Sequence, residues 1–307
     1  MAKQISIVQE QAGKQSAPDS CRISVVIPAF NEEAAIGMVL DDVKSALEEI
    51  DAPHEIIVVD DGSTDSTGAI VSRREGIRLI RQDENKGYGA SLKAGIRMTT
   101  GDIIVITDAD GSYPNGEIPR LIKALDDCDM VVGSRNGESV QVPLVRRLPK
   151  WVLGKLANIL CGRRIPDLNS GLRAFRKQAY LQFTGIISDG FSFTTTLTLA
   201  LMCNDFAVRF LPIDYYRRKG KSKIRPFHDT LNFLVLIVRL ATYFNPLKVF
   251  VPPAMLILAA GILHGLYQLI SSRLAGIGEV PVLLILAGIQ ILFLGLLADL
   301  ISRRPPR

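Results

Sequence analysis

The sequence predicts an α/β domain with a mostly parallel central sheet, followed by two helices that cross a membrane. Short apolar runs rich in β-branched residues alternate with helical patterns through the first half of the chain, as in a parallel sheet covered by helices on both faces. Two apolar segments of about 22 residues end the chain, and each is long enough to cross a hydrocarbon core of about 30 Å.

Five apolar runs predict the strands, and polar residues follow several of them. The second run ends at residues 60–63 (DDGS) and the fourth at residues 108–110 (DAD). Ligands of open α/β sheets bind beyond the carboxyl ends of the strands, where these residues are expected. Helical patterns fill the intervals at residues 33–50, after residue 63, where Ser63 or Asp65 can cap the helix, and at 88–98. The predicted strands are residues 23–27, 55–59, 77–81, 103–107 and 130–132.

The composition excludes several classes of protein. With 48% hydrophobic and 22% charged residues, the chain is more apolar than a soluble enzyme and too charged to be wholly embedded in a membrane. A net charge of +5 over 307 residues does not by itself indicate nucleic-acid binding. Four scattered cysteines and three histidines predict neither a zinc site nor a disulfide framework, and favour a reducing compartment.

The chain divides into four predicted regions. Residues 1–20 are polar and form a flexible tail rather than a signal peptide. The α/β domain is expected over 21–228 and a membrane-proximal amphipathic helix over 229–247, with a further basic helix at 144–160. Residues 248–307 hold the two membrane-spanning helices, at about 249–270 and 280–301, although two buried core helices would give the same hydropathy.

Charges around the two apolar segments predict their orientation. Lys248 precedes the first segment, and Arg303, Arg304 and Arg307 follow the second, whereas the loop between them carries Arg273 against Glu279. Positive charge concentrates on the cytoplasmic side of membrane proteins. We therefore expect an integral membrane protein whose α/β domain is cytoplasmic.

Asp108 and Asp110 are the strongest candidates for metal binding. Two carboxylates at i and i+2, after a buried strand, can approach one Mg²⁺ or Mn²⁺ ion together with substrate phosphate oxygens. The alternative is a solvated acidic turn. Asp60 and Asp61 can accept hydrogen bonds from a base or ribose, or can simply cap the following helix. Residues 87–89 (GYG) begin like a dinucleotide-binding fingerprint, but Leu92 stands where its third glycine belongs.

Five segments together resemble one family. VVIPAFNEE, EIIVVDDGSTDST, NKGYGASLKAG, DIIVITDADGSYP and VVGSRN, in this order within residues 22–230, are similar to family 2 glycosyltransferases of the GT-A fold. The resemblance implies a nucleotide-diphosphate sugar donor and a metal held by Asp108 and Asp110, with Asp110 the direct ligand. The implied contacts to the nucleotide sugar are Pro28, Phe30, Glu32, Asp60, Asp61, Lys86 and Asp108.

Later segments narrow the resemblance to polyprenyl-phosphate sugar transferases. Residues 167–173 (DLNSGLR) resemble that group's DxxSGxR signature, residues 217–223 (RRKGKSK) its RxxGxSK loop, and Arg135 an arginine that faces the acceptor phosphate. The match implies catalytic roles for Asp110, Asp167 and Arg217. The implied contacts to the lipid phosphate or the diphosphate are Arg135, Arg147, Ser170, Arg173, Lys221 and Lys223. Arg146 and Arg147 can instead lie against anionic lipid headgroups.

The expected activity is transfer of a sugar, with inversion, from a nucleotide diphosphate to undecaprenyl or dolichyl phosphate at the cytoplasmic face of a bacterial plasma membrane. Mg²⁺ or Mn²⁺ is the expected cofactor, and the lipid bilayer, but not nucleic acid, is an expected partner. Two alternatives stay open: a family 2 transferase with a saccharide acceptor, and a non-catalytic membrane scaffold. A processive synthase would need a QxxRW-type motif, which Trp151 does not supply. The sugar, the nucleotide, the polyprenol and the oligomeric state stay open as well.

Overall fold

The computed structural model describes residues 23–135, 154–155, 157–158, 161–216, 242–243, 245–271 and 278–302. The chain divides into two compact units. The first comprises Met1–Gly154 and Arg164–Pro226, and the second comprises Lys155–Arg163 and Phe227–Arg307. The predicted helices at 144–160 and 229–247 lie largely outside the described residues.

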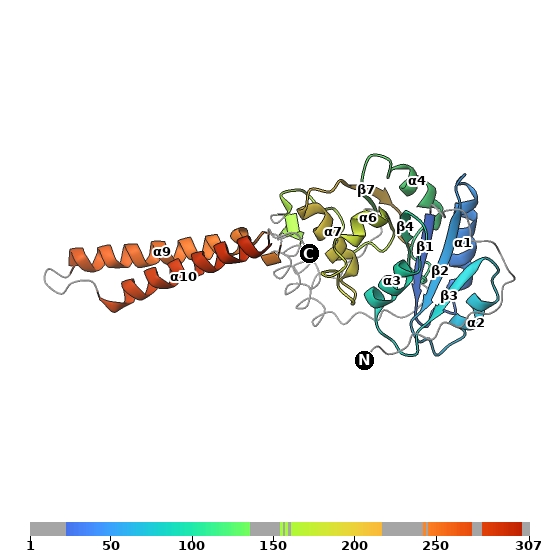
Figure 1. Ribbon diagram of the computed structural model, residues 1–307, viewed down its shortest axis with the longest axis horizontal. Coiled ribbons are helices and arrows are strands. Elements are labelled where there is room, and N and C mark those ends of the chain that lie inside the picture. The colour runs from blue at the N-terminus through green and yellow to red at the C-terminus, as the bar shows by residue number, and fades with distance from the viewer. Residues whose placement is uncertain are drawn as a thin grey trace. The chain divides into compact units, whose positions relative to one another are not determined.

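In the described part of the first unit, one seven-stranded sheet runs in the order β3-β2-β1-β4-β6-β5-β7 (Figure 1). Neighbouring strands are parallel except where β6 lies between β4 and β5, with which it pairs antiparallel. The mostly parallel sheet expected from the sequence is confirmed, although β6 and β7 were not predicted. The strands are β1 Ile23–Ala29, β2 His54–Asp60, β3 Ile77–Arg81, β4 Ile103–Ile106, β5 Met130–Arg135, β6 Arg173–Arg176 and β7 Val208–Ile213.

Alternation along the strands produces two apolar layers. Val25 and Ile27 of β1 face one core, whereas Val26 between them faces the other, and all three are fully buried. Side chains of a strand point alternately to the two faces of a sheet, so a strand buried on both faces is apolar throughout. This is why the strands appear in the sequence as continuous apolar runs.

Helices cover both faces of this sheet. On the α1 face, Ile36, Val39, Leu40 and Val43 recur at helical spacing and are buried against β1 and β2. The opposite face is covered by α3 and α7. The helical elements of this unit are α1 Ile36–Glu48, α2 Thr67–Ser72, α3 Tyr88–Arg97, η1 Asn115–Glu117, α4 Ile118–Lys123, α6 Lys177–Leu181 and α7 Phe193–Cys203.

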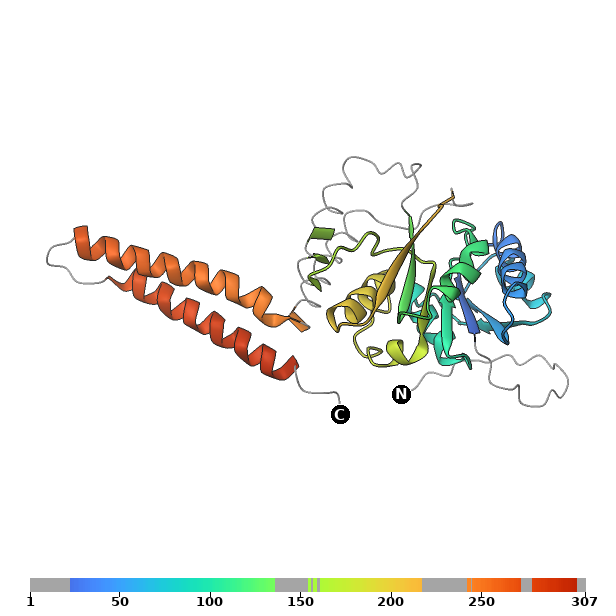
Figure 2. The ribbon, with the colours of Figure 1, turned by 90° about the horizontal axis from the view of Figure 1, so that it is seen from above.

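The second unit contains a helical hairpin, α9 Pro246–Ser271 and α10 Glu279–Ser302, whose helices lie side by side in both views (Figures 1 and 2). Both helices are long and apolar enough to cross a membrane. Their large apolar side chains point outward, with Leu256 72% and Ile270 80% exposed. A soluble protein buries such a face, so this hairpin has the composition of one surrounded by lipid.

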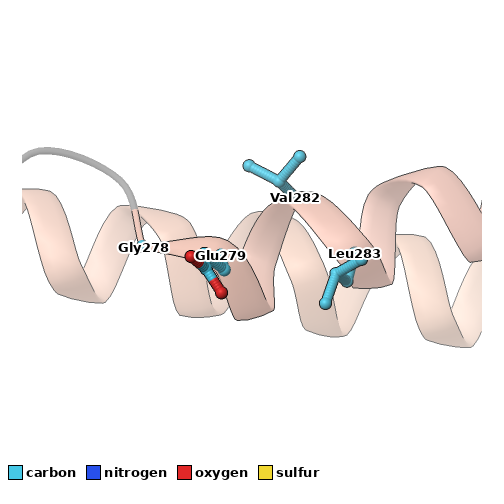
Figure 3. A pocket seen from close by; sticks show the side chains of 4 residues that line it. All are labelled: Gly278, Glu279, Val282 and Leu283. Carbon is cyan, nitrogen blue, oxygen red and sulfur yellow. The ribbon is translucent and has the colours of Figure 1, made fainter.

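Glycines allow the two helices to approach closely. A Cβ atom on Gly261 would lie 2.9 Å from the Ile285 side chain, and one on Gly288 would lie 2.6 Å from Leu258. Small residues of this kind let helix backbones pack closely where no hydrophobic force drives them together. A shallow hollow at the start of α10 is lined by Gly278, Glu279, Val282 and Leu283 (Figure 3). This lining has one carboxylate and no convergent set of polar groups, unlike a site for a charged substrate.

Candidate active site

The candidate site lies where strand ends meet at one edge of the sheet. The parallel strands β1, β2 and β4 end at this edge, and antiparallel β6 begins there. Ala29 pairs with Asp60, and Ile106 pairs with Arg173. The topology therefore brings the predicted motifs of residues 28–32, 60–63, 108–110 and 170–173 to the same edge, as open α/β sheets do with their ligand sites.

The loops after β1 and β2 bind each other through reciprocal hydrogen bonds. The Asn31 N–H donates to Ser63 Oγ at 3.0 Å, and the Thr64 N–H donates to Asn31 Oδ1 at 2.8 Å. The Glu32 N–H donates to Thr67 Oγ1 at 2.8 Å. Asn31 adopts a positive φ of 53°, which asparagine tolerates better than most residues. These bonds fix the backbone beside Phe30 and Glu32, two predicted nucleotide contacts, whereas Pro28 lies within β1 itself.

Asp60 and Asp61 are buried and hold backbone N–H groups. Asp60 Oδ1 accepts from the Ser63 N–H at 3.0 Å. Asp61 accepts from the N–H groups of Lys86 and Gly87, at 2.8 and 2.9 Å, one on each carboxylate oxygen. Neither carboxylate caps the following helix α2, whose N-cap residue is Ser66, and Asp61 instead anchors the loop that enters α3. Their contact with a nucleotide stays a prediction, as does that of exposed Lys86.

Asp108 and Asp110 follow β4 on one turn. Asp110 is 7% exposed, and its Oδ1 accepts from Ser112, from the N–H at 3.0 Å and from the hydroxyl at 2.6 Å. Asp108 is half-buried and accepts a hydrogen bond from the Tyr88 hydroxyl at 2.9 Å. Within the described residues no group of three or more His, Cys, Asp or Glu side chains forms a metal cluster. A carboxylate pair of this kind suits an ion that also takes phosphate oxygens.

Arg135 and Asp167 form a bidentate ion pair at the end of β5. Arg135 Nε donates to Asp167 Oδ2 at 2.7 Å, and Nη2 donates to Oδ1 at 2.9 Å. The N–H groups of Arg135 and Asn169 add two further bonds to the same carboxylate. The two side chains are only 20% and 6% exposed. The Arg135 guanidinium also lies over the Tyr215 ring, 5.2 Å from its centroid, in a cation–π contact.

This pairing perturbs both ionisable groups. Burial alone would raise the pKa of Asp167, but the hydrogen bonds and charge of Arg135 outweigh it and lower the pKa below its ordinary value. Burial would likewise lower the pKa of Arg135, and the bonds to Asp167 raise it instead. Asp167 is therefore ionised at neutral pH and is a weak base.

Arg173 and Ser170 lie deeper than the resemblance suggests, because both are fully buried. The Arg173 guanidinium donates to the Ser170 carbonyl, and to the Thr194 carbonyl and Thr198 Oγ1 at 2.9 Å each. Burial lowers the pKa of Arg173 to about 10. Arg173 thus ties the start of β6 to α7, and its contact with a lipid phosphate stays a prediction that would require this network to open.

The other predicted phosphate contacts, Arg147, Arg217, Lys221 and Lys223, lie outside the described residues. Tyr216, directly before Arg217, donates its N–H to the Ser112 carbonyl at 2.9 Å. This bond holds Tyr216 beside Ser112, the residue that donates two hydrogen bonds to Asp110. The motif comparison did not indicate Tyr88, Tyr113 or Tyr215 as site residues. Their roles depend on contacts across the fold, which no local pattern encodes.

Comparison with known proteins identifies the family. The description Glycosyl transferase family 2 matches residues 24–183, more than half of the chain. The chain belongs to glycosyltransferase family 2. A second description, GtrB C-terminal hairpin, matches residues 245–303, which contain α9 and α10. The family predicted from the motifs is confirmed.

Relatives of this family 2 enzyme include three whose names state their activity. The low-salt glycan biosynthesis hexosyltransferase Agl6 of Haloferax volcanii is 32% identical over 67% of this chain, and the match spans about half (51%) of that protein. The dolichyl-phosphate hexose transferase of Haloferax volcanii is 31% identical over 67% of this chain and 87% of its own length. The dodecaprenyl-phosphate galacturonate synthase of Rhizobium johnstonii is 26% identical over 96% of this chain and 92% of its own.

A solved structure confirms the fold. Glucosyl-3-phosphoglycerate synthase from Mycobacterium tuberculosis, in complex with Mn²⁺, uridine diphosphate and phosphoglyceric acid, superimposes with a TM-score of 0.56. The two chains are 24% identical, and the match covers 72% of this chain and 78% of that one. The GT-A fold expected from the resemblance is therefore present in this family 2 member.

Proposed function

We propose that this family 2 glycosyltransferase moves a sugar from a nucleotide-diphosphate donor to a polyprenyl phosphate at the cytoplasmic face of a membrane. The observation that carries the proposal is the meeting, at one sheet edge, of the Asp108–Asp110 carboxylates with the paired arginine Arg135. The two carboxylates suit a metal ion bound to the diphosphate of the donor. The arginine suits the phosphate of the acceptor, as a monoanion or a dianion. The relatives named for dolichyl and dodecaprenyl phosphate support the acceptor.

Asp108 and Asp110 are the residues that would hold the metal. Mg²⁺ and Mn²⁺ take few carboxylates and keep positions for water and phosphate oxygens, which fits a site with two carboxylates better than a closed zinc site would. When bound, the ion neutralises the charge that builds on the departing diphosphate. The Mn²⁺ and uridine diphosphate complex of the solved relative supports this assignment.

Arg135 is the described residue that we assign to the acceptor phosphate. Its bonds to Asp167 use Nε and Nη2, and we assign Nη1 to the phosphate. A guanidinium held in this way has lost its freedom before the substrate arrives, which lowers the entropic cost of binding. We assign the basic loop that begins at Arg217, with Lys221 and Lys223, to the same group of phosphates. The bond between Tyr216 and Ser112 supports its nearness to Asp110.

Asp167 orients Arg135 in this proposal and does not act as a base. A phosphate monoester has a second pKa near ~6, so a lipid phosphate is largely a dianion at neutral pH and carries no proton that must be removed. Asp167 would be a poor proton acceptor in any case, because its pKa is lowered. The phosphate oxygen attacks the anomeric carbon while that carbon's bond to the nucleoside diphosphate breaks, which inverts the configuration.

The C-terminal hairpin anchors the enzyme where its acceptor lies. We propose that both termini are cytoplasmic and that the segment from Ser271 to Glu279 faces the other side. In a background without the four native cysteines, a cysteine at Ser272 should react with an impermeant thiol reagent in intact cells. A cysteine at Ser16 should not react. The reverse pattern would overturn the orientation.

Transfer assays decide between this proposal and its alternatives. Radiolabelled UDP- and GDP-sugars are each incubated with a short-chain polyprenyl phosphate, the full chain in detergent, and Mg²⁺ or Mn²⁺. We expect one donor to label the lipid phosphate. Labelling of a free saccharide and never of the lipid would favour a transferase with a saccharide acceptor. Absence of any transfer or donor binding would favour the non-catalytic scaffold.

A further inference from the structure

The glycine-rich turn at residues 87–89 is a sequence motif that the proposed function leaves without a role. Gly87 adopts a φ of 98°, which an L-residue with a side chain rarely adopts. A Cβ atom on Gly89 would lie 2.7 Å from the backbone carbon of Asp189 and 2.8 Å from the Gly190 carbonyl oxygen. The two glycines thus let the chain turn into α3 and let residues 188–190 pack directly against the start of that helix.

This turn aims the Tyr88 side chain at the carboxylate pair. The Tyr88 hydroxyl donates to Asp108 Oδ1 at 2.9 Å. The phenol is the donor in this bond, because a carboxylate oxygen can only accept. The Phe191 ring stacks on the Tyr88 ring, with centroids 6.1 Å apart and planes 12° from parallel. The aromatic pair fixes the direction of this hydrogen bond.

A second surface confines Asp108 from another direction. A Cβ atom on Gly171 would lie 2.7 and 2.8 Å from the two Asp108 carboxylate oxygens. The Gly171 N–H is held in turn by the Tyr113 hydroxyl, at 2.6 Å. The Asp108 carboxylate therefore accepts the Tyr88 hydroxyl on one oxygen and packs against the backbone of Gly171. Few rotamers of Asp108 satisfy both contacts.

We infer that Tyr88 is a positioning residue, whose hydroxyl holds Asp108 in the rotamer that presents its carboxylate to the metal and diphosphate of the donor. The inference rests on the proposed function, because it requires a metal at Asp108 and Asp110. Hydrogen bonds to the side chains that ligate a metal fix their orientation, and removing one typically lowers metal affinity or activity about tenfold to a hundredfold. A tyrosine that served only for packing would lose almost nothing on replacement by phenylalanine.

Mn²⁺ binding to the full chain in detergent tests the inference without any turnover. Free Mn²⁺ is measured by electron paramagnetic resonance during a titration, with and without uridine diphosphate. We expect Tyr88→Phe to weaken Mn²⁺ binding about tenfold to a hundredfold while its melting temperature stays close to that of the unmodified protein. Tyr180→Phe is the matched control, because Tyr180 on α6 is buried in an aromatic cluster with Phe175 of β6 and Phe193 of α7. The Tyr180→Phe variant should bind Mn²⁺ normally.

The outcomes separate this inference from the proposed function. Equal Mn²⁺ affinity of Tyr88→Phe and the unmodified protein would overturn the positioning role and leave the metal site standing. No Mn²⁺ binding by the unmodified protein would overturn the metal assignment and the inference with it. Phe191→Ala carries the test if Tyr88→Phe does not fold, since Phe191 is 53% exposed. Loss of stacking should weaken Mn²⁺ binding about twofold to tenfold, and unchanged binding would contradict the inference.

Discussion

On the donor side of the site, Asp60 and Asp110 rest on backbone N–H groups of their own turns, whereas on the acceptor side Arg135 and Arg173 reach partners far along the chain. Asp60 accepts from Ser63, and Asp110 accepts from Ser112. Arg135, by contrast, pairs with Asp167, which lies 32 residues further on. Arg173 reaches carbonyl and hydroxyl groups of α7 that lie 21 and 25 residues away.

The difference indicates how each side should respond to substitution. A carboxylate held by a local turn keeps its place when an amide of the same shape replaces it, so its loss affects charge and chemistry more than folding. A buried ion pair is different, because removing one partner leaves the other charge buried and unpaired. We therefore expect donor-side substitutions to reduce activity in a folded protein, and acceptor-side substitutions to reduce stability as well.

The largest expected effect is that of Asp110→Asn on turnover. The amide oxygen can still accept from Ser112, so the turn should keep its shape. The lost charge should lower the rate of transfer by about a hundredfold or more. Transfer to a short-chain polyprenyl phosphate is measured after chelation and again after adding Mg²⁺ or Mn²⁺. Asp51→Asn, at an exposed position, is the control, and full activity of Asp110→Asn in chelator would remove the metal assignment.

Next is the effect of Asp167→Ala on stability. Arg135 would be left largely buried without its counter-ion, which should lower the free energy of unfolding by about 3 kcal/mol. Thermal denaturation in detergent measures the loss. Asp41→Ala is the matched control, since it breaks the more exposed ion pair with Arg74 and should cost at most about 1 kcal/mol. Equal losses in the two variants would mean that burial does not raise the cost of breaking the Arg135–Asp167 pair, which would contradict the expectation for the acceptor side.

The same pair has a defined pH dependence. The pKa of Asp167 is lowered in the folded state, so its contribution to stability is fully present above the ordinary value of 3.8 and is lost as the pH falls through the folded-state pKa. The stability difference between the unmodified protein and Asp167→Asn should therefore be constant at neutral pH and shrink below about pH 4. A pH–rate profile of Asp167→Asn tests whether Asp167 acts as a general base. If the unmodified enzyme shows an acidic limb that this variant lacks, the orienting role of Asp167 is contradicted.

A smaller effect is expected from Arg217→Ala. A hydrogen bond between charged groups contributes about 1.5–3 kcal/mol, so transfer efficiency should fall tenfold to a hundredfold. The loss should appear mainly with polyprenyl phosphate, and donor binding should change less. Arg217→Lys should retain part of the activity, because lysine keeps the charge but not the paired donors. Equal activity of the lysine variant and the unmodified enzyme would mean that charge alone matters at this position.

The smallest effect is expected at Asp65, on the donor side. Its carboxylate accepts from the Thr67 N–H at 2.9 Å and from the Thr67 hydroxyl, at the start of α2. Asp65→Ala should lower the free energy of unfolding by about 1 kcal/mol, as for the loss of a helix cap. Asp65→Asn should restore most of it. Thermal denaturation measures both, and a loss as large as that of Asp167→Ala would contradict the contrast between the two sides.

Much of this architecture could be predicted from the sequence. The predicted strand at 77–81 coincides with β3, and those at 23–27 and 55–59 lie within β1 and β2, because buried parallel strands are continuous apolar runs. Strand β6 was not predicted because its four residues begin and end with arginine. Strand β7 was not predicted because it mixes Arg209 and Pro212 with apolar residues. Neither composition predicts a strand without the neighbours that pair with it.

The candidate site divides in the same way. Asp60, Asp61, Asp108 and Asp110 were recognisable because each follows a run that must be a strand, and the ends of parallel strands share one edge. The motif residues Arg135 and Asp167 were recognisable singly, but nothing in the spacing predicts that they bind each other. Tyr88 shows the limit most clearly, because its contact with Asp108 depends on a glycine turn and on a loop about 100 residues later.

By itself, the sequence determined the α/β domain, the family, the apolar hairpin and the polar residues at the strand ends, because these follow from local periodicity and from motifs of contiguous residues. Only the tertiary structure decided which charges neutralise each other. It buried Arg173 among carbonyls, bound Arg135 to Asp167, and set Tyr88 against Asp108. The strength of a charge–charge or hydrogen-bond contact depends on the distance and burial of atoms that chain folding brings together, and no local stretch of sequence specifies either.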